Sequence, residues 1–502
     1  MERASGVLMP VSSLPGPYGI GGFGWNAYDF VDFLASCKQH YWQILPLTTT
    51  SYGDSPYQSF SARAGNPNFI DFAELIEAGY LEQRDIDGVY LGSDPSNVDY
   101  GAIFGGRRQI LDRAAERFAA DKPADFDDFI QANEDWLIPY CEFMTVKEEC
   151  GLKAFWEWPA ELRTRGEASA KVCADHPARM LYHQMTQYFF DRQWSRLKAY
   201  ANERDILIIG DLPIYVSRDS VEMWATPELF KIDAAGNPVS VAGTPPDQFS
   251  ATGQYWGNPI YDWDAMESDG FSWWEGRIRA ALDMYDVIRL DHFRGFEAYW
   301  EVPFSSPDSS YGSWTQGPGL KFFKTLEEKL GTLPIIAEDL GFLTPEVYQL
   351  LADTGFPGMK VLEFGFGDPG EDSEYLPHNY PVHSVAYPGT HDNDTILGWL
   401  DSLTPEQAKF ARHYLRLSRR EGLHWGVLRS LWASPAQLTV VQMQDLLGLD
   451  RRARMNTPST LGGNWQWRAL PEAMSAGLAR RLYRETAAYQ RLPRGGTAKN
   501  EE

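Results

Sequence analysis

The chain has 502 residues, of which 43% are hydrophobic and 23% are charged, as is typical of folded globular proteins. This composition excludes a disordered or fibrous protein, and the formal net charge of −24 disfavours a nucleic-acid partner or an anionic membrane surface. The sequence shows neither an apolar run of about 18 residues, as a membrane span requires, nor a secretory leader. We therefore expect a cytoplasmic protein with no membrane partner.

Eight short runs rich in apolar and β-branched residues follow one another along the chain and predict eight strands. Helical patterns lie between most of them, for example at 26–37, 323–330, 345–355 and 405–417. Alternating strands and helices form parallel sheets, and eight such units favour a closed barrel over an open sheet. We therefore predict an α/β fold, a (β/α)8 TIM barrel with insertions and no separate C-terminal β-domain. The predicted strands are 6–14, 41–47, 206–214, 286–293, 334–342, 358–366, 383–392 and 438–447.

Two long segments interrupt this alternation. About 160 residues separate the second and third predicted strands, and much of 105–200 has helical periodicity, so we expect a mainly helical insertion over about 60–200. The segment of about 216–285 is rich in Gly, Pro, Asp and Trp, and we expect it to be mostly loop that covers part of a cleft. Both insertions would belong to one catalytic barrel over residues 1–502.

Four of the predicted strands end in acidic residues. The C-terminal ends of barrel strands open onto one face, so we expect these acids to converge on one cleft. A single acid at a strand end is commonly a solvated residue or a helix cap. Four carboxylates in one pocket repel one another, and such costs are usually found at functional sites. The four acids are Asp211, Asp291, Glu338 and Asp392, and Asp339 directly follows Glu338.

The residues around these acids indicate how each would ionise. Arg289 and Asp291 lie two positions apart on a strand and share a face, and a guanidinium beside a carboxylate favours its charged form. Glu338 follows the apolar run 335–337, so an apolar cleft that holds other acids should raise its pKa, as a general acid requires. Two carboxylates that flank a scissile bond are the usual apparatus of glycoside chemistry, and a third acid can hold sugar hydroxyls.

Two of the nine histidines adjoin these acids. His292 follows Asp291 and His391 precedes Asp392, so we expect both to donate hydrogen bonds to sugar hydroxyls. The sequence has no HExxH motif, and its four cysteines have no CxxC spacing. We therefore expect neither a metal site nor a cofactor.

Several long motifs closely resemble the 4-alpha-glucanotransferases called amylomaltases, or disproportionating enzymes, of the alpha-amylase clan. In the wider clan the motif of the third strand usually ends in Asn-His, and that Asn is tied to a structural calcium. The segment DLPIYV here favours the amylomaltase branch and removes the reason to expect calcium. The matching motifs are SSLPGPYGIGGFG (12–24), GDSPYQSFSARAGNP (53–67), DLPIYV (211–216), GTPPDQFSATGQYWGNPIYDW (243–263), VIRLDHFRGF (287–296), IIAEDLG (335–341), YPGTHDNDT (387–395) and RMNTPSTLGGNW (454–465).

This resemblance implies a role for each matched residue. It implies that Asp291 is the nucleophile, Glu338 the general acid/base, and Asp392 the acid that stabilises the transition state and distorts the bound sugar. It also implies a retaining double displacement that moves part of an α-1,4-glucan or maltooligosaccharide to the 4-hydroxyl of glucose or another glucan. The residues that match the sugar-binding groove of the family are Tyr57, Asp211, Asp247, Gln254, Trp256, Arg289, His292 and His391.

Three alternatives are compatible with parts of the sequence. GIGGFG at 19–24 fits the dinucleotide fingerprint G-x-G-x-x-G, but Pro15 and Pro17 separate it from the preceding strand and the next strand ends in LPLTTT instead of an acid. A glucan-binding protein without catalysis predicts missing or replaced acids at the strand ends. An alpha-glucan hydrolase needs the same carboxylates as a transferase and remains open.

Overall fold

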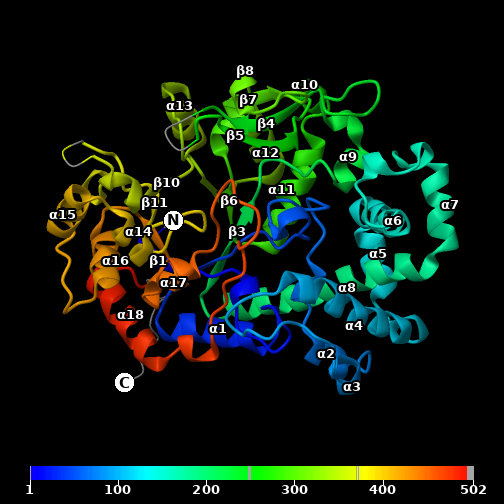
Figure 1. The fold of residues 1–502 in the computed structure, drawn as a ribbon, viewed down its shortest axis with the longest axis horizontal. Coiled ribbons are helices and arrows are strands. Elements are labelled where there is room, and N and C mark those ends of the chain that lie inside the picture. The colour runs from blue at the N-terminus through cyan, green and yellow to red at the C-terminus, as the bar shows by residue number, and fades with distance from the viewer. Residues whose placement is uncertain (1, 247–249, 369, 371, 494–502) are drawn as a thin grey trace.

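The computed structural model describes residues 2–246, 250–368, 370 and 372–493. At its centre, eight parallel strands form a closed barrel in the order β1-β12-β11-β10-β9-β6-β3-β2 (Figure 1). All eight predicted strands occur, which confirms the (β/α)8 fold. Their bounds are β1 (Ala4–Leu8), β2 (Tyr41–Gln43), β3 (Leu207–Leu212), β6 (Val287–Leu290), β9 (Ile335–Ala337), β10 (Gly358–Val361), β11 (Ser384–Tyr387) and β12 (Leu438–Gln442).

The barrel interior changes from apolar to polar along the strands. Successive side chains of a strand alternate between the inside of the barrel and the surrounding helices. On β6, the inward position Val287 belongs to the buried apolar cluster of the interior, whereas Arg289 and Asp291, at the following alternate positions, form an ion pair. On β3, Ile209 likewise belongs to the apolar cluster, and Asp211, two positions later, is charged and pairs with Arg289. The alternation of the strands therefore delivers charged side chains to one end of an otherwise apolar barrel.

Helices surround the barrel, and those between β2 and β3 lie together on one side of it (Figure 1). Within the described ranges, none of the helices is both long and apolar enough to cross a bilayer. The helices that follow barrel strands include α1 (Trp25–Ser36), α11 (Ser272–Met284), α12 (Gly319–Leu330), α13 (Pro345–Thr354), α14 (Ile396–Ser402), α15 (Pro405–Tyr414), α16 (Leu423–Ala433), α17 (Met443–Leu446) and α18 (Ala476–Ala488). Those between β2 and β3 are α2 (Phe72–Glu77), α3 (Gln83–Ile86), α4 (Tyr100–Ala120), α5 (Phe126–Ala132), α6 (Glu134–Glu149), α7 (Glu167–Asp175) and α8 (Pro177–Asn202).

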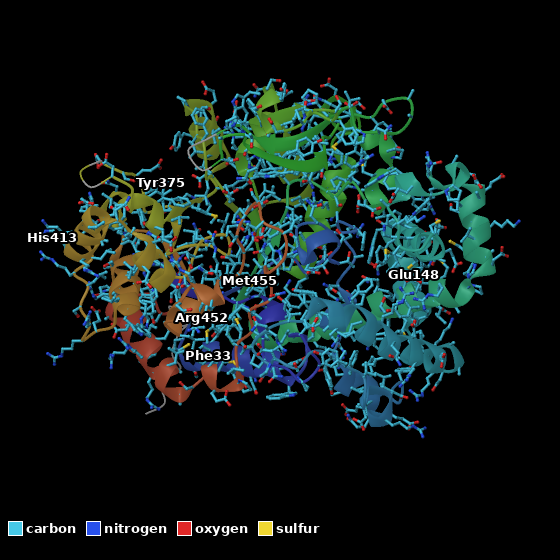
Figure 2. All side chains as sticks on the ribbon, viewed as in Figure 1. Phe33, Glu148, Tyr375, His413, Arg452 and Met455 are labelled. Atoms are coloured by element: carbon cyan, nitrogen blue, oxygen red, sulfur yellow. The ribbon has the colours of Figure 1, made fainter. Side chains whose placement is uncertain are left out.

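A buried ionic cluster around Glu148 joins three of these helices. Figure 2 labels Glu148. Its carboxylate on α6 accepts a hydrogen bond of 2.7 Å from Arg179 on α8 and pairs with Arg108 on α4 at 2.7 Å. Burial raises the pKa of Glu148, but the hydrogen bonds from His183 and Arg179 outweigh this and lower the pKa to about 2. The carboxylate is therefore charged and ties α4, α6 and α8 together.

Helix α8 also fixes the long loop that follows β2. The side-chain amide of Gln187 accepts from the N–H of Gly65 at 2.7 Å and donates to its carbonyl at 2.9 Å. Gln193 makes the same pair of hydrogen bonds with the backbone of Asp71. Because both amides are buried, each loop peptide is held at two points, and the preceding segment that carries Tyr57 is anchored against the barrel.

The segment 216–285 differs from the predicted loop. It contains α9 (Val221–Ala225), β4 (Ser240–Thr244), β5 (Gln254–Pro259), α10 (Trp263–Ser268) and α11. Strand β4 pairs with β5 on one side and with β7 (Ala298–Pro303) on the other, and β7 pairs with β8 (Ser313–Gln316), which gives a four-stranded antiparallel sheet. The loop prediction is wrong for these positions, because β4 pairs with β5 within the segment and with β7 beyond β6.

Candidate active site

Arg289 joins two of the acids at the polar end of the barrel. Its Nη1 donates to both carboxylate oxygens of Asp211 at 2.8 Å and to Oδ1 of Asp291 at 2.9 Å. Asp211 and Arg289 are also directly paired in the register of β3 and β6. The expected contact between Arg289 and Asp291 is confirmed, and the shared cation keeps two neighbouring carboxylates from repelling each other.

Asp291 is the more accessible carboxylate of this group, with 27% of its side chain exposed. Its backbone N–H donates to the carbonyl of Leu212 at 3.0 Å, which fixes it at the end of β3. The next residue, His292, has φ 49° and adopts the left-handed conformation, at a typical cost of about 1–2 kcal/mol for a residue with a side chain. This turn leaves Asp291 at the mouth of the barrel and directs the His292 N–H toward Glu338.

Glu338 has the opposite environment, because its side chain is almost completely buried. The N–H of His292 donates to Oε2 at 2.7 Å, and the N–H of Leu340 donates to Oε1 at 3.0 Å. Burial is the largest influence on its pKa, and Asp291 adds to it while Arg289 opposes it, so that the pKa rises to about 8. The direction is the one expected from its apolar strand and acidic neighbours.

Asp339 does not join the group, although it adjoins Glu338 in the sequence. Its Oδ1 accepts from the backbone N–H of Met359 on β10 at 2.6 Å. Gly358 leaves room for this carboxylate, because a Cβ at that position would lie 2.4 Å from Oδ2. Asp339 therefore fastens β9 to β10 and has a structural role.

The third acid of the site is held by a segment from another part of the chain. Asp392 follows β11, has 45% of its side chain exposed, and accepts at Oδ1 from the side-chain amide of Asn456 at 2.6 Å. Arg454 donates to the carbonyl of Asp392 at 2.5 Å, and the N–H of Asn456 donates to the carbonyl of His391 at 3.1 Å. Sequence reasoning missed both Arg454 and Asn456, although they belong to the RMN motif that contributes to the resemblance.

Tyr57 and His391 form one wall of the site. The Tyr57 hydroxyl lies 2.9 Å from both Asp211 Oδ2 and His391 Nε2, and the two rings stack with centroids 5.2 Å apart. A hydroxyl that donates to a carboxylate must accept from the histidine, so Nε2 of His391 carries a proton. The buried Nδ1 of His391 has no partner among the described residues and can accept a hydrogen bond from a sugar hydroxyl when the ring is neutral. Trp465, also missed from the sequence, packs against both rings.

Strand β5 borders the site beside Asp291. The ring of Trp256 contacts the ring of His292 edge to face with centroids 4.9 Å apart, and its Nε1 donates to Oε1 of Gln254 at 3.2 Å. Burial lowers the pKa of His292 to about 4, so this ring is neutral at pH 7. Asp247, expected in the same groove, lies outside the described residues.

No group of three or more His, Cys, Asp or Glu side chains in the described part of the chain is arranged to hold a metal ion.

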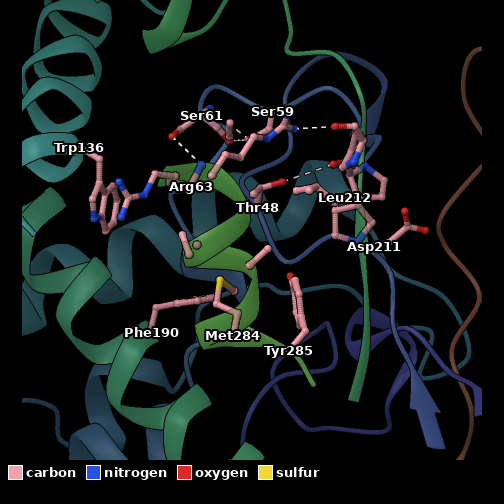
Figure 3. A pocket seen from close by; sticks show the side chains of 18 of the residues that line it. Thr48, Ser59, Ser61, Arg63, Trp136, Phe190, Asp211, Leu212, Met284 and Tyr285 are labelled. Carbon is pink, nitrogen blue, oxygen red and sulfur yellow. Dashed lines mark hydrogen bonds between the residues drawn. The ribbon is translucent and has the colours of Figure 1, made fainter. Parts of the chain in front are cut away.

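A separate cavity of about 170 Å³, lined in part by Tyr57 and Asp211, lies between the barrel and the helical side of the molecule (Figure 3). Its walls include neither Asp291, Glu338 nor Asp392, so it is distinct from the group of catalytic candidates. Its size and partly polar walls suit ordered water. The labelled lining residues are Thr48, Ser59, Ser61, Arg63, Trp136, Phe190, Asp211, Leu212, Met284 and Tyr285.

The chain matches known proteins over almost its whole length. A family model described as 4-alpha-glucanotransferase matches residues 9–472. The chain is 51% identical over 498 residues to the 4-alpha-glucanotransferase of Streptococcus pneumoniae, which covers 98% of both chains. It is 44% identical over 504 residues to that of Thermus thermophilus, which covers 98% of this chain and 100% of the relative.

The fold agrees with a solved structure of the same kind. The amylomaltase from Streptococcus agalactiae in complex with acarbose matches with a TM-score of 0.95 and 48% identity, over 98% of this chain and 100% of that chain. The barrel, the group of carboxylates, the family model and the relatives therefore all indicate the same family. This chain belongs to the 4-alpha-glucanotransferase family.

Proposed function

We propose that this protein transfers segments of α-1,4-glucans by a retaining double displacement, with Asp291 as nucleophile and Glu338 as general acid/base. The observation that carries the assignment is the contrast between the two carboxyl groups. Asp291 is partly exposed and accepts a hydrogen bond from the Arg289 guanidinium. Glu338 is buried beside Asp291, and burial raises its pKa to about 8, which favours a carboxylic acid. Two acids with divergent environments supply one nucleophile and one proton donor.

The reaction has two steps that use the same pair of residues. Glu338 first protonates the glycosidic oxygen while Asp291 attacks C1, so the C1–O bond breaks, the leaving sugar carries the proton away, and a glycosyl-Asp291 ester forms. The Glu338 carboxylate then takes the proton of the acceptor 4-hydroxyl, whose oxygen attacks C1 and releases Asp291. Two inversions retain the α configuration, and this mechanism requires carboxyl groups roughly 5–5.5 Å apart.

The other residues of the site would hold and distort the sugar. Asp392, oriented by Asn456, would stabilise the positive charge that develops at C1. His391 would bind a sugar hydroxyl through Nδ1, while Tyr57, Asp211 and Arg289 keep this wall in place. Gln254 and Trp256 on β5 would extend the groove along the glucan, and the family resemblance adds Asp247 to the residues proposed to bind it.

Transfer instead of hydrolysis requires that water be kept from the intermediate while an acceptor is held in place. We assign this role to the segment 243–263, because its strand β5 borders the site through Trp256. Incubation with maltotriose tests the assignment: transfer yields glucose and maltooligosaccharides longer than the substrate, whereas hydrolysis yields maltose and glucose without chain growth. Glucose is proposed as one acceptor among glucans, and the cytoplasmic location stays a prediction.

The pH dependence should follow the proton of Glu338. The first step needs Glu338 protonated, and since burial raises its pKa to about 8, the acid form persists at pH 7 and is lost above about pH 8. We expect kcat/KM for maltotriose to fall about tenfold per pH unit above that value. A pH profile of kcat/KM checks this, and an alkaline decline already complete at pH 6 would contradict it.

Asn456→Ala should lower kcat for disproportionation by about 10–100-fold and change KM little. Its amide orients Asp392 through the 2.6 Å hydrogen bond, and small misplacements of a group that acts on the transition state cost rates of this order. Steady-state kinetics with maltotriose measures the effect. The exposed Asn97→Ala is the control, and an unchanged kcat in Asn456→Ala would exclude the orienting role.

A further inference from the structure

The two backbone N–H groups that donate to the carboxylate of Glu338 come from different segments of the chain, and the N–H of Phe293 donates to the Glu338 carbonyl at 3.0 Å. His292 precedes a short 3-10 turn, η7 (Phe293–Phe296), that follows β6. Leu340 belongs to the loop that follows β9. Both N–H groups reach the same carboxylate only if the turn and the loop keep a fixed spacing.

The side chain of Arg294 spans this gap. It belongs to η7, and its Nη1 donates to the carbonyl of Phe342, in the loop after β9, at 2.6 Å. Only 4% of the side chain is exposed, and the guanidinium lies over the ring of Trp314 on β8, 3.7 Å from the ring centroid. Glu297 lies 3.8 Å from Nη2. The guanidinium is therefore enclosed by a ring, a carboxylate and a carbonyl, which restricts its movement.

The loop after β9 gains little from apolar burial. Phe342 has 67% of its surface exposed, and Gly341 adopts φ 91°, a conformation that side chains disfavour. A segment with few buried apolar contacts opens at low free-energy cost. The hydrogen bond from the buried Arg294 is thus an anchor for the loop two residues beyond Leu340.

We propose that Arg294 is a positioning residue that holds the Leu340 N–H and the His292 N–H on Glu338 at the same time. The inference rests on the proposed role of Glu338 as acid/base. Arg294 is separated from the reacting atoms by these two backbone segments, and it acts through them.

Loss of this anchor has a defined electrostatic consequence. Arg289 and Asp291 face Glu338 from the end of β6, the neutral ring of His292 adjoins them, and Tyr375 faces it from the segment after β10. These side chains are all retained when Arg294 is replaced, but loss of the guanidinium removes one influence that lowers the pKa of His292. A weaker hydrogen bond from Leu340 favours the protonated form of Glu338, so the pKa of Glu338 should rise further.

The test compares Arg294→Met with Arg294→Lys. Methionine keeps much of the volume over Trp314 but donates no hydrogen bond, whereas lysine still donates to the Phe342 carbonyl. For Arg294→Met we expect the alkaline limb of the kcat/KM profile to move up by roughly 0.5–1 pH unit and kcat at pH 7 to fall about tenfold. For Arg294→Lys we expect the limb to stay within about 0.3 unit of the wild-type limb.

Hydrogen exchange provides a readout that does not depend on catalysis. Peptides that cover 338–344 should exchange faster in Arg294→Met than in the wild type or in Arg294→Lys. Arg279→Met, at an exposed arginine of α11, is the control and should change neither readout. If Arg294→Met does not fold, Arg294→Gln replaces it, because glutamine keeps a shorter N–H donor. For Arg294→Gln we expect the alkaline limb to move up and residues 338–344 to exchange faster, both by less than in Arg294→Met.

The outcomes separate this inference from the proposed function. An unmoved alkaline limb together with unchanged exchange at 338–344 would overturn the positioning role of Arg294. Full activity of Glu338→Gln would instead remove Glu338 from its catalytic role, while the exchange of 338–344 would still report whether Arg294 anchors the loop.

Discussion

Asp291→Asn should reduce transfer between maltooligosaccharides by at least about 10⁴-fold and leave their binding almost unchanged. Asparagine has the shape of aspartate and can still accept a hydrogen bond from Arg289, but its neutral amide is a poor nucleophile at C1. Arg289 keeps Asp211 as a charged partner, so the variant should fold. Disproportionation of maltotriose measures kcat, and calorimetric titration measures the Kd.

The matched control for this variant is Asp353→Asn, at an exposed aspartate of α13, which should retain full activity. The ratio of the kcat of Asp291→Asn to that of Asp353→Asn shows how much of the loss is specific to position 291, because both variants replace an aspartate by an asparagine. If Asp291→Asn kept activity within a hundredfold of the wild type, Asp291 could not be the nucleophile.

Glu338→Gln should lose about 10³-fold in transfer from maltotriose but retain much of the first step with α-maltosyl fluoride. In the proposed mechanism the sugar leaving group needs a proton from Glu338, whereas fluoride leaves without one. Glutamine also removes the base of the second step, so the glycosyl-enzyme should accumulate. A burst of fluoride release followed by a slow steady state is the expected time course.

Two controls sharpen this second experiment. Glu346→Gln, at an exposed glutamate of α13, should show no burst and normal turnover. An equal loss of rate with maltotriose and with the fluoride would mean that Glu338 supports the fold or the nucleophile and does not transfer the proton.

The barrel could be predicted from the sequence because its signals are local. A buried parallel strand is a short apolar run, and on β6 the alternation of Val287, Arg289 and Asp291 shows directly which side chains share a face. The ends of these runs also give the acids, because a barrel gathers its strand ends on one face. The contact between Arg289 and Asp291 follows from spacing alone.

The parts that could not be predicted depend on pairing between distant segments. Strand β4 pairs with β7, which lies beyond β6, so the partner on that side is distant in the sequence. Asn456 reaches Asp392 across 64 positions, and Tyr57 reaches Asp211 across 154. No periodicity of the sequence connects such residues. Tyr57 was therefore predicted as a site residue only from the family resemblance, and Asn456 was not predicted.

The proposed role of Asp291 is tested most directly by locating the residue that carries the covalent intermediate. Glu338→Gln is mixed with α-maltosyl fluoride, quenched in acid during the burst and digested, and the peptides are analysed by mass spectrometry. A double displacement through Asp291 predicts a maltosyl group attached to the side chain of Asp291. A maltosyl group on Asp392 or another residue, or a burst without any labelled peptide, would contradict it.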